Sequence, residues 1–515
     1  MKRQLIAAID VGSHAIRMKI GEIKSDGTFK ELENFRKLIS MGHDTFTTGQ
    51  VCFETVDLVC EMLAVFKQIM NDYGVKVYKA LATSAIREAS NRDYIVDQIK
   101  LKTGLELRVL SNSEEQYLTH KAVKYGLKKY NTIINEGAVI VVVGAGSIQV
   151  TTYKDGHLTS SQNVKMGALR VKEVLAEIEL SSLKYQDILN EYIDANMSGL
   201  DFFSKDVIYK HFIAVSGETS MLQQIIAIED NVKENIERIS KGRFKKLFIT
   251  LSDMTMDEIQ KAYNVKYGRA SIIIPSMMLF SKFLEQAKTK EIIIPSTSLV
   301  NGIIYDMYEQ LYNLDVQNEV SGDIITNAKV IAVKFGIDVG HAYAVDAYCT
   351  SIFDRTKEIH GLADKERLLL RLAAILHDCG RFINFENHHM HGFYLIKSLE
   401  IFGLSENDME IISHVAKYHS FLLPSSQDEE FMKLPEHNRV VIAKLVAILR
   451  ISDALDRGHK QKIEIISVKL KNKELIIKGQ TKEYVNLEEW SFRKKSQFFQ
   501  TVFGITPVLK IVREI

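Results

Sequence analysis

QLIAAIDVGSHAIR, residues 4–17, decides the fold of the amino-terminal half of this 515-residue chain. An apolar run ends in Asp10, a turn follows at Gly12 and Ser13, and a second run leads to Arg17. The pattern predicts a strand, a tight turn and a return strand. Such a turn offers backbone N–H groups to a phosphate, and Asp10 is placed to hold a hydrated Mg²⁺. A hairpin with a polar tip explains the same residues without chemistry.

The same pattern of a strand followed by a small-residue turn occurs twice more. Residues 138–147 read AVIVVVGAGS, and residues 213–219 read IAVSGET. The turn residues of interest are Gly144, Gly146, Ser147 and Gly217. Because each half of this region begins with such a turn, we expect a duplicated α/β domain that holds phosphate in the cleft between its halves.

Two polar segments follow predicted strands. A strand over 75–82 leads into Thr83 and Ser84 at the start of a helix that contains Arg87, a combination that suits an oxyanion. An N-cap residue with a surface arginine is the simpler explanation. A strand over 105–110 leads into Glu114 and Glu115, which the helix dipole alone can explain.

Composition narrows the classes of function. A chain of this length is expected to form roughly three or four domains. The net charge is +1, so any anion site is local and we expect no DNA binding. The four cysteines are scattered, which fits a reducing cytoplasm. No apolar run reaches the length of a membrane span, and we expect a cytoplasmic protein.

A second chemical signal lies at residues 375–391, ILHDCGRFINFENHHMH. An apolar helix over 366–376 runs directly into His377 and Asp378, and an adjacent His-Asp pair at a buried helix end needs a partner. A divalent metal accepts both ligands. Ten of the 15 histidines follow position 340, as expected for a metal-binding carboxy-terminal domain.

The remaining pattern predicts short strands at 271–274 and 292–294, and helices from 324 to 456. Strands at 463–470, 474–479 and 508–512 and a helix at 487–503 complete the chain.

Taken in order, these motifs resemble the exopolyphosphatase/guanosine pentaphosphate phosphatase family (Ppx/GppA) over essentially the whole chain. The matching segments are 10–17, 82–89, 109–115, 144–147, 166–170 and 216–217. The resemblance implies an α/β fold with a duplicated actin-like (ASKHA, RNase H-like) first half, an all-α HD domain and a small α/β cap. The expected domains are 1–125, 126–312, 313–460 and 461–515.

The resemblance also implies a reaction, the hydrolysis of a terminal phosphoanhydride of polyphosphate or guanosine pentaphosphate by water. The implied partners are polyphosphate and guanosine penta- or tetraphosphate. Glu115 matches the catalytic glutamate of the family, and Mg²⁺ with Asp10 would assist. The implied phosphate-binding residues are Gly12, Ser13, Arg17, Arg87, Gly144, Gly146, Ser147 and Gly217. A homodimer is implied as well.

Several positions depart from the pattern of the family. Val142 replaces an aspartate, Ile148 and Gln149 replace a Thr-Glu pair, and Glu218 lies beside Gly217. His14 with Ala15 and Asn112 are the other departures. A missing metal-anchoring carboxylate at position 142 predicts slow hydrolysis, and Glu218 is expected to repel phosphate.

The carboxy-terminal half is similar to two-metal HD phosphohydrolases in the order of its ligands: His341, His377, Asp378, His391, His419 and Asp453. The resemblance implies one metal on His341, His377, Asp378 and Asp453, and a second on His391 and His419 with Asp378 shared. Manganese, iron and zinc suit these ligands. His388 and His389 are further members of the same cluster, and an inherited scaffold with satisfied surface histidines is the alternative.

Three functions follow from these patterns. The leading one is phosphoanhydride hydrolysis in the amino-terminal cleft. The second is an HD-type, metal-dependent phosphohydrolase acting on a nucleotide or phosphoester, with a regulatory first half. The third is a non-catalytic sensor of polyphosphate or guanosine tetra- and pentaphosphate.

Overall fold

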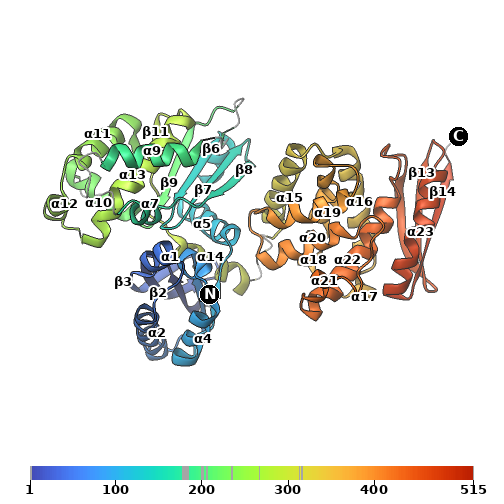
Figure 1. Ribbon diagram of the computed structural model, residues 1–515, viewed down its shortest axis with the longest axis horizontal. Coiled ribbons are helices and arrows are strands. Elements are labelled where there is room, and N and C mark those ends of the chain that lie inside the picture. Colours follow the sequence, from blue (N-terminus) through green and yellow to red (C-terminus); the bar gives the residue numbers. More distant parts are fainter. Residues whose placement is uncertain are drawn as a thin grey trace. The chain divides into compact units, whose positions relative to one another are not determined.

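The computed structural model describes residues 3–176, 185–198, 202–203, 207–232, 236–265, 267–312, 314 and 317–513. The chain divides into two compact units, Met1–Asn318 and Glu319–Ile515, which Figure 1 colours from blue to yellow and from yellow to red. All four cysteines lie in the described part and are free thiols. None of the described helices is long and apolar enough to cross a membrane.

The first unit contains two sheets with the same strand order. The first sheet runs β3-β2-β1-β4-β5 and consists of β1 (Arg3–Val11), β2 (Ala15–Lys24), β3 (Phe29–Leu38), β4 (Val77–Ala82) and β5 (Leu107–Val109). The second runs β8-β7-β6-β9-β11-β10 and consists of β6 (Ala138–Val143), β7 (Ile148–Lys154), β8 (His157–Val164), β9 (His211–Ser216), β10 (Arg238–Ser240) and β11 (Glu291–Ile293). In each sheet an antiparallel meander of three strands continues into two parallel strands. The predicted duplication is confirmed.

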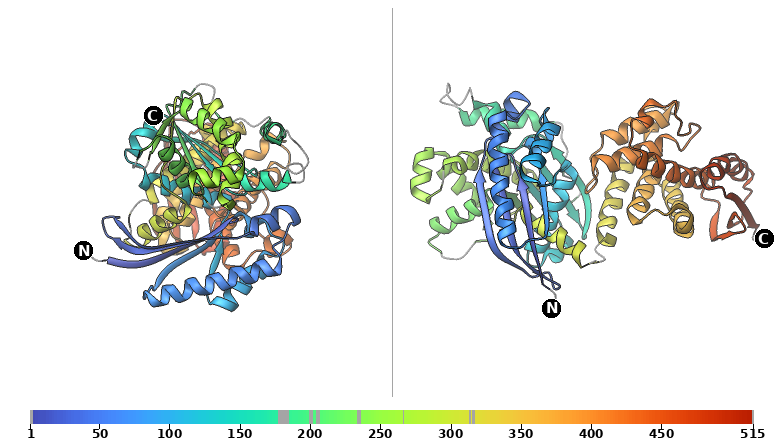
Figure 2. Two further views of the ribbon diagram at one scale, coloured as in Figure 1. Left: turned by 90° about the vertical axis from the view of Figure 1, so that its left-hand side faces the viewer. Right: turned by 90° about the horizontal axis from the view of Figure 1, so that it is seen from below.

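Strand β1 is buried on both faces because its alternate side chains meet different helices. Ala7, Ile9 and Val11 belong to the core under α2 (Phe53–Asp72), which lies along this sheet in Figure 2. Ile6 and Ala8 pack against α14 (Leu299–Leu311) on the other face. The smaller helices of this half are α1 (Met41–Thr48), α3 (Ser84–Glu88), α4 (Arg92–Thr103), α5 (Asn112–Gly126) and α6 (Tyr130–Asn135).

The second sheet shares a core with the helices of its own half, α7 (Ala168–Val174), α9 (Tyr185–Met197), α10 (Thr219–Glu229), α11 (Lys241–Ser252), α12 (Met256–Tyr263) and α13 (Tyr267–Ala287). The strand predicted at 271–274 is wrong, because these residues lie inside α13. Ile272, Ile273 and Ile274 are all buried. A helix that is apolar all round has the same short β-branched run as a buried strand.

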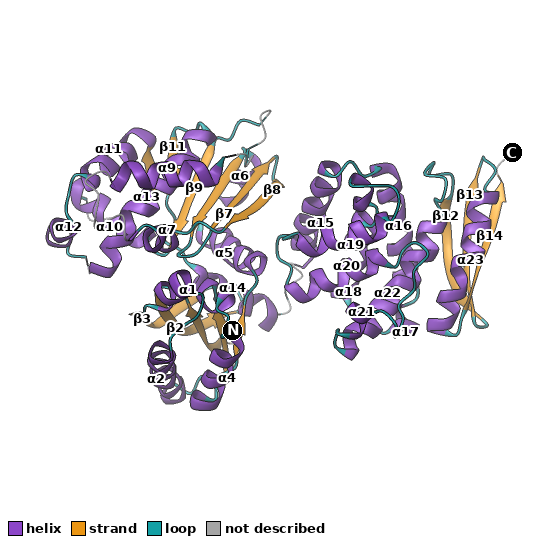
Figure 3. Cartoon of the chain, viewed as in Figure 1, coloured by secondary structure: helices purple, strands orange, loops and turns teal. Residues whose placement is uncertain are grey.

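The second unit begins with helices and ends with a sheet, as Figure 3 shows. Its helices are α15 (Gln317–Lys334), α16 (Val339–Arg355), α17 (Lys357–His360), α18 (Asp364–Leu376), the 3₁₀ turn η1 (Cys379–Phe382), α19 (His388–Ser398), α20 (Glu406–Lys417), α21 (Glu429–Met432) and α22 (Glu436–Ala454). The sheet has the order β12-β13-β14 with β12 (Glu464–Lys471), β13 (Glu474–Thr481) and β14 (Thr506–Arg513). Helix α23 (Asn486–Phe503) joins β13 to β14 and packs on α22.

Candidate functional site

A pocket in the first unit lies where the turns of the two sheets meet. The loop after β1 contributes Gly12 and Ser13, and the loop after β6 contributes Gly144. Gly217 follows β9, and Glu115 lies in the first turn of α5. The pocket therefore joins corresponding ends of the duplicated halves, as the sequence predicts.

The two hairpin turns close in the same way. Gly12 N donates to Ala15 O at 3.1 Å, and Gly144 N donates to Ser147 O at 2.9 Å. The first turn is also fixed by a side chain, because Ser13 Oγ accepts a hydrogen bond from Ala85 N at 3.0 Å. A Cβ atom on Gly146 would lie 2.6 Å from Ser84 Oγ, so only glycine fits there. Both turns are thus held by several contacts, as a preorganised phosphate site requires.

Glu114 and Glu115, which are neighbours on α5, make different contacts. Glu114 forms a capping box with Ser111, whose N–H donates to Glu114 Oε2 at 2.9 Å. Glu115 lines the pocket, and its Oε2 accepts from Arg87 Nη1 at 2.9 Å. Arg87 Nη1 also donates to Leu110 O at 2.9 Å. The helix-start explanation therefore applies to Glu114, whereas Glu115 is held at the pocket by an arginine.

Asp10 is a buried carboxylate whose two oxygens have different surroundings. Arg17 Nη1 donates to Asp10 Oδ2 at 3.1 Å, whereas Oδ1 has no partner among the described residues. Burial raises the pKa of Asp10 to about 6, and Glu115 adds to the effect, against the opposing charge of Arg17. An orphaned buried carboxylate oxygen beside a pocket fits a hard cation such as Mg²⁺.

Arg17 also connects the two halves of the pocket. A Cβ atom on Gly217 would lie 2.9 Å from Arg17 Nη2, so this glycine allows the guanidinium to approach the third turn. Glu218 forms an ion pair with Arg36. Arg36 therefore offsets the negative charge that we expected to repel phosphate. Val142 lines the pocket and brings no carboxylate to it.

Most of the predicted residues of this half line the pocket: Asp10, Gly12, Ser13, Arg17, Glu115, Gly144 and Gly217. Arg87, Gly146 and Ser147 lie behind it. Arg87 holds Glu115, Gly146 O accepts from Arg170 Nε at 2.7 Å, and Ser147 O closes the turn. These three residues therefore support the residues of the pocket and do not line it.

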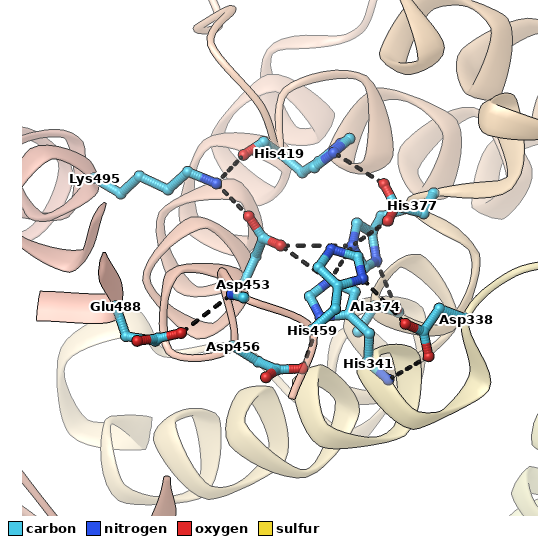
Figure 4. A network of polar contacts seen from close by, with 12 residues as sticks. Asp338, His341, Ala374, His377, His419, Asp453, Asp456, His459, Glu488 and Lys495 are labelled. Carbon is cyan, nitrogen blue, oxygen red and sulfur yellow. Dashed lines mark hydrogen bonds and ion pairs between the residues drawn. The ribbon is translucent and has the colours of Figure 1, made fainter. Parts of the chain in front are cut away.

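A second polar cluster is buried in the other unit (Figure 4). His341 lies in the first turn of α16, and His377 with Asp378 follows α18. His419 follows α20, Asp453 lies near the end of α22, and His388 begins α19. Because helix ends from distant parts of the sequence meet here, side chains up to about a hundred residues apart converge.

The cluster has two parts that share Asp378. In the first, His341 Nε2 lies 3.2 Å from His377 Nε2 and 3.2 Å from Asp453 Oδ1. In the second, His388 Nε2 and His419 Nε2 are 3.2 Å apart, and each is 3.6 Å from Asp378 Oδ1. Asp378 Oδ2 lies 3.8 Å from His377 Nε2. One carboxylate therefore directs an oxygen to each part.

All four imidazoles turn Nε2 inward because Nδ1 is engaged on the outside. Nδ1 lies 2.7 Å from Ala374 O in His377, 2.6 Å from Ala416 O in His419 and 3.0 Å from Phe385 O in His388. In His341 it lies 2.9 Å from Asp456 Oδ2. A carbonyl oxygen accepts a hydrogen bond only from a protonated nitrogen. In a neutral imidazole the other nitrogen, here Nε2, then carries a lone pair. This is how metal-binding histidines are oriented.

The charges of the cluster suit a cation. Burial acts to lower the pKa of His341, but hydrogen bonds to Asp453 and Asp456 raise it to about 9. Burial acts to raise the pKa of Asp378, but the charges of His377, His419 and Arg381 lower it to about 2. Asp378 Oδ1 has no hydrogen-bond partner in the described part of the chain. A metal would displace the His341 proton and use the inward lone pairs.

His388, and not the predicted ligand His391, lies beside Asp378 and His419. Three groups of side chains in the described residues are close enough to hold a metal ion, and neither His388 nor His391 belongs to any of them. His388 and His391 both lie on α19, and spacing alone cannot tell which one faces the cluster. His459 joins one group and Lys495 contacts Asp453; neither is marked by a motif in the sequence.

Comparisons with known proteins cover both units. The model of the Ppx/GppA phosphatase family matches residues 22–311, and the model of domain III of the Ppx/GppA phosphatases matches residues 325–494. A guanosine-5'-triphosphate,3'-diphosphate pyrophosphatase of Pseudoalteromonas translucida is 20% identical over 455 residues, 88% of this chain and 87% of the relative. A relative of the same name in Photobacterium profundum is 20% identical over 87% of this chain and 85% of its own.

Solved structures share the fold of the first unit. An exopolyphosphatase from Cytophaga hutchinsonii ATCC 33406 is 21% identical and covers 60% of this chain and 98% of its own, with a TM-score of 0.53. The Ppx/GppA family member of Aquifex aeolicus is 22% identical and covers 60% of this chain and 99% of its own, with a TM-score of 0.50. This likeness and the duplicated strand order confirm an actin-like α/β first half. An HD fold for the helices that follow remains a prediction.

Proposed function

Because the chain belongs to the Ppx/GppA phosphatase family, we propose that it releases the terminal phosphate of a phosphoanhydride in the pocket of its first unit. The names of its relatives indicate a hydrolase of this class. Those names also support pppGpp or polyphosphate as the substrate. They do not separate the two, and both stay candidates.

Glu115 carries this proposal. It lines the pocket from the first turn of α5, and its Oε2 lies 2.9 Å from Arg87 Nη1. A carboxylate held in this way can orient a water molecule and accept its proton while the water attacks phosphorus. The separate capping role of Glu114 supports this assignment, since the helix does not need Glu115 for its cap.

The rest of the pocket binds charge. Gly12 N and Gly144 N close their own turns, so other N–H groups of the three turns, with the Arg17 guanidinium, would neutralise phosphate oxygens as negative charge moves in the transition state. Asp10 would hold a Mg²⁺ ion, which supplies charge neutralisation when bound. Since Val142 provides no second metal-anchoring carboxylate, we expect slower turnover than in relatives that have one.

Glu115→Gln tests the proposal, with Glu114→Gln as the matched control on the same helix turn. Loss of the base is expected to lower phosphate release from polyphosphate or pppGpp at least about 100-fold. Glutamine still completes a capping box at position 114, so the control is expected to keep nearly full activity. Equal activity of Glu115→Gln and the parent protein would contradict the proposed role.

The buried cluster of the second unit favours a second candidate function, a metal-dependent phosphoesterase of the HD type. The observation behind it is the four inward Nε2 atoms with Asp378 between them. His341, His377, Asp378 and Asp453 would hold one divalent ion, and His388 and His419 with Asp378 a second. Mixed imidazole and carboxylate ligands suit Mn²⁺, Fe²⁺ or Zn²⁺ better than Mg²⁺. Such ions, when bound, lower the pKa of water and polarise phosphate oxygens.

Metal analysis of the purified protein tests this candidate. We expect about two transition-metal equivalents per chain in the parent protein, because the cluster has two parts. His388→Ala is expected to lose one equivalent, whereas His391→Ala and the exposed His437→Ala are expected to lose none. A folded protein without stoichiometric metal would exclude the second candidate.

The two variants Glu115→Gln and His377→Ala separate all three functions. Loss of phosphate release only in Glu115→Gln supports the first site, and loss only in His377→Ala supports the second. If neither changes phosphate release and the ligand still binds, the sensor function stands. A homodimer stays a prediction that rests on the family resemblance, and a cytoplasmic location stays a prediction that rests on composition.

A further inference from the structure

We infer that helix α23 completes the imidazole–carboxylate cluster of the second unit: Lys495 fixes Asp453, and Glu488 fixes the loop that carries Asp456 and His459. The inference rests on the second candidate function, because it assigns positioning residues to that metal centre. Figure 4 shows both contacts reaching the cluster from the side of α23.

Lys495 holds the outer oxygen of a ligand carboxylate. Its Nζ forms an ion pair with Asp453 Oδ2 and donates to His419 O at 3.0 Å. The other oxygen, Asp453 Oδ1, faces His341 Nε2 at 3.2 Å. The side chains of Lys495 and Asp453 are 12% and 5% exposed, so water does little to weaken this pair. Lys495 therefore fixes the direction in which Oδ1 points and connects two ligand-bearing segments.

Glu488 holds the chain that follows α22. Only 1% of its surface is exposed, and its Oε1 accepts from Gly458 N at 3.2 Å. A Cβ atom on Gly458 would lie 2.8 Å from the same oxygen, so glycine permits the contact. The loop beyond it is strained, with φ of 53° at His459 and 48° at Gln461. Strained residues of this kind persist only where their surroundings hold them.

The held loop orients His341 from two sides. Asp456 Oδ2 lies 2.9 Å from His341 Nδ1, and the His459 ring stacks on the His341 ring with centroids 3.7 Å apart at 15°. Asp456 Oδ1 also accepts from Lys460 N at 3.0 Å and Gln461 N at 2.6 Å. The partner that fixes the tautomer of a ligand histidine is thus anchored by the carboxy-terminal helix.

The net charge of the cluster also depends on α23, because Lys495 lies on this helix. Asp378 and Asp453 are the carboxylates of the cluster, and each has a cation beside it, Arg381 for Asp378 and Lys495 for Asp453. Removing Lys495 leaves one more negative charge, which by itself would attract a cation. It also frees a buried carboxylate to rotate. Loss of such an outer partner costs about 10- to 100-fold in metal affinity, so we expect the positional effect to prevail.

Cobalt titration of the metal-free full-length protein tests the inference, with the visible absorption of bound Co²⁺ as the readout. Lys495→Met is expected to bind Co²⁺ about 10- to 100-fold more weakly and to change the absorption band. Lys494→Met is the matched control, because Lys494 is the preceding residue, is exposed and lies over the Trp490 ring. The control is expected to bind like the parent protein.

A double-mutant cycle with Asp453→Asn tests whether Lys495 acts on metal binding through Asp453. If Lys495 acts through Asp453, the double variant loses little more affinity than Asp453→Asn alone. Additive losses would contradict this route. Should Lys495→Met not fold by circular dichroism, Lys495→Gln takes its place, since it keeps a hydrogen-bond donor without the charge. Glu488→Ala is expected to alter the absorption band as well.

The outcomes separate this inference from the function on which it rests. If the parent protein takes up no Co²⁺, the metal centre itself is wrong. If the parent binds Co²⁺ and both Lys495→Met and Glu488→Ala bind it unchanged, only the role of α23 is wrong.

Discussion

Two buried histidines show how strongly surroundings decide the charge of a single residue. His120 lies between hydroxyl groups, with Nε2 at 2.5 Å from Tyr130 and 2.7 Å from Tyr153, and burial lowers its pKa to about 3. His341 lies between carboxylates, and its pKa is raised to about 9 despite burial. Tyrosine hydroxyls satisfy a neutral ring without offsetting a positive charge. His120 is therefore a neutral structural residue.

His120→Gln is expected to reduce the acid sensitivity of the first unit. The pKa of His120 in the folded state lies below its ordinary value of 6.5, so its stabilising contribution is present above pH 6.5 and is lost as the pH falls toward 3. As the pH falls from 7.5 to 5.5, His120 is protonated in the unfolded state, and this should lower the free energy of unfolding by about 1.4 kcal/mol. Urea denaturation at the two pH values measures the difference, with the exposed His157→Gln as control. An equal pH dependence in the parent and His120→Gln would contradict the linkage.

At the scale of elements, close backbone contacts place the candidate ligands. A Cβ atom on Gly380 would lie 1.8 Å from His388 O and 2.4 Å from Gly392 N. The absence of a side chain at Gly380 therefore lets α19 lie directly on η1. This contact brings His388, the first residue of α19, within 3.6 Å of Asp378. The second part of the buried cluster therefore depends on Gly380, which is not itself a candidate ligand.

Gly380→Ala is expected to destabilise the second unit by about 2 to 3 kcal/mol, since the backbone must move to admit a methyl group. It should also lower the metal content by about one equivalent, because α19 carries His388 away from Asp378. Gly322→Ala is the matched control on α15 of the same unit, where a Cβ atom meets no described atom within 4 Å. Alanine there is expected to stabilise the helix by up to about 1 kcal/mol. Thermal unfolding and metal analysis give both readouts, and unchanged metal content in a destabilised Gly380→Ala would separate packing from ligand placement.

The sequence predicts elements better than it predicts which side chain of an element does chemistry. Periodicity and turn residues were sufficient for the repeated strands, because a duplicated pattern leaves little choice of fold. They failed at 271–274, where an all-round apolar helix resembles a strand. The local pattern of the sequence does not separate Glu114 from Glu115, whereas the structure shows that Glu114 caps α5 and that Glu115 lines the pocket beside Arg87. Lys495 reaches Asp453 across 42 positions, and such tertiary contacts leave no local pattern.

At the scale of the whole molecule, the chain carries two candidate sites in two compact units. The pocket with Glu115 lies in Met1–Asn318, and the cluster with Asp378 lies in Glu319–Ile515. The ligand types differ between them. Oxygen ligands, backbone amides and guanidinium groups in the first suit phosphate and Mg²⁺, whereas imidazoles in the second suit transition metals. Each unit should therefore respond to its own ligand.

Scanning calorimetry tests this separation. A ligand that binds only the folded state at 100 times its Kd adds about 2.7 kcal/mol of stability, which for a unit of roughly 200 residues raises the melting temperature by about 5 to 10 °C. Adding Mn²⁺ to metal-free protein is expected to raise only the melting temperature of the second unit, which is the one that Gly380→Ala lowers. Mg²⁺ with phosphate should raise only the melting temperature of the first unit, which contains His120. His377→Ala should abolish the shift with Mn²⁺ and leave the shift with Mg²⁺ and phosphate intact. Loss of both shifts in His377→Ala would contradict independent ligand sites in the two units.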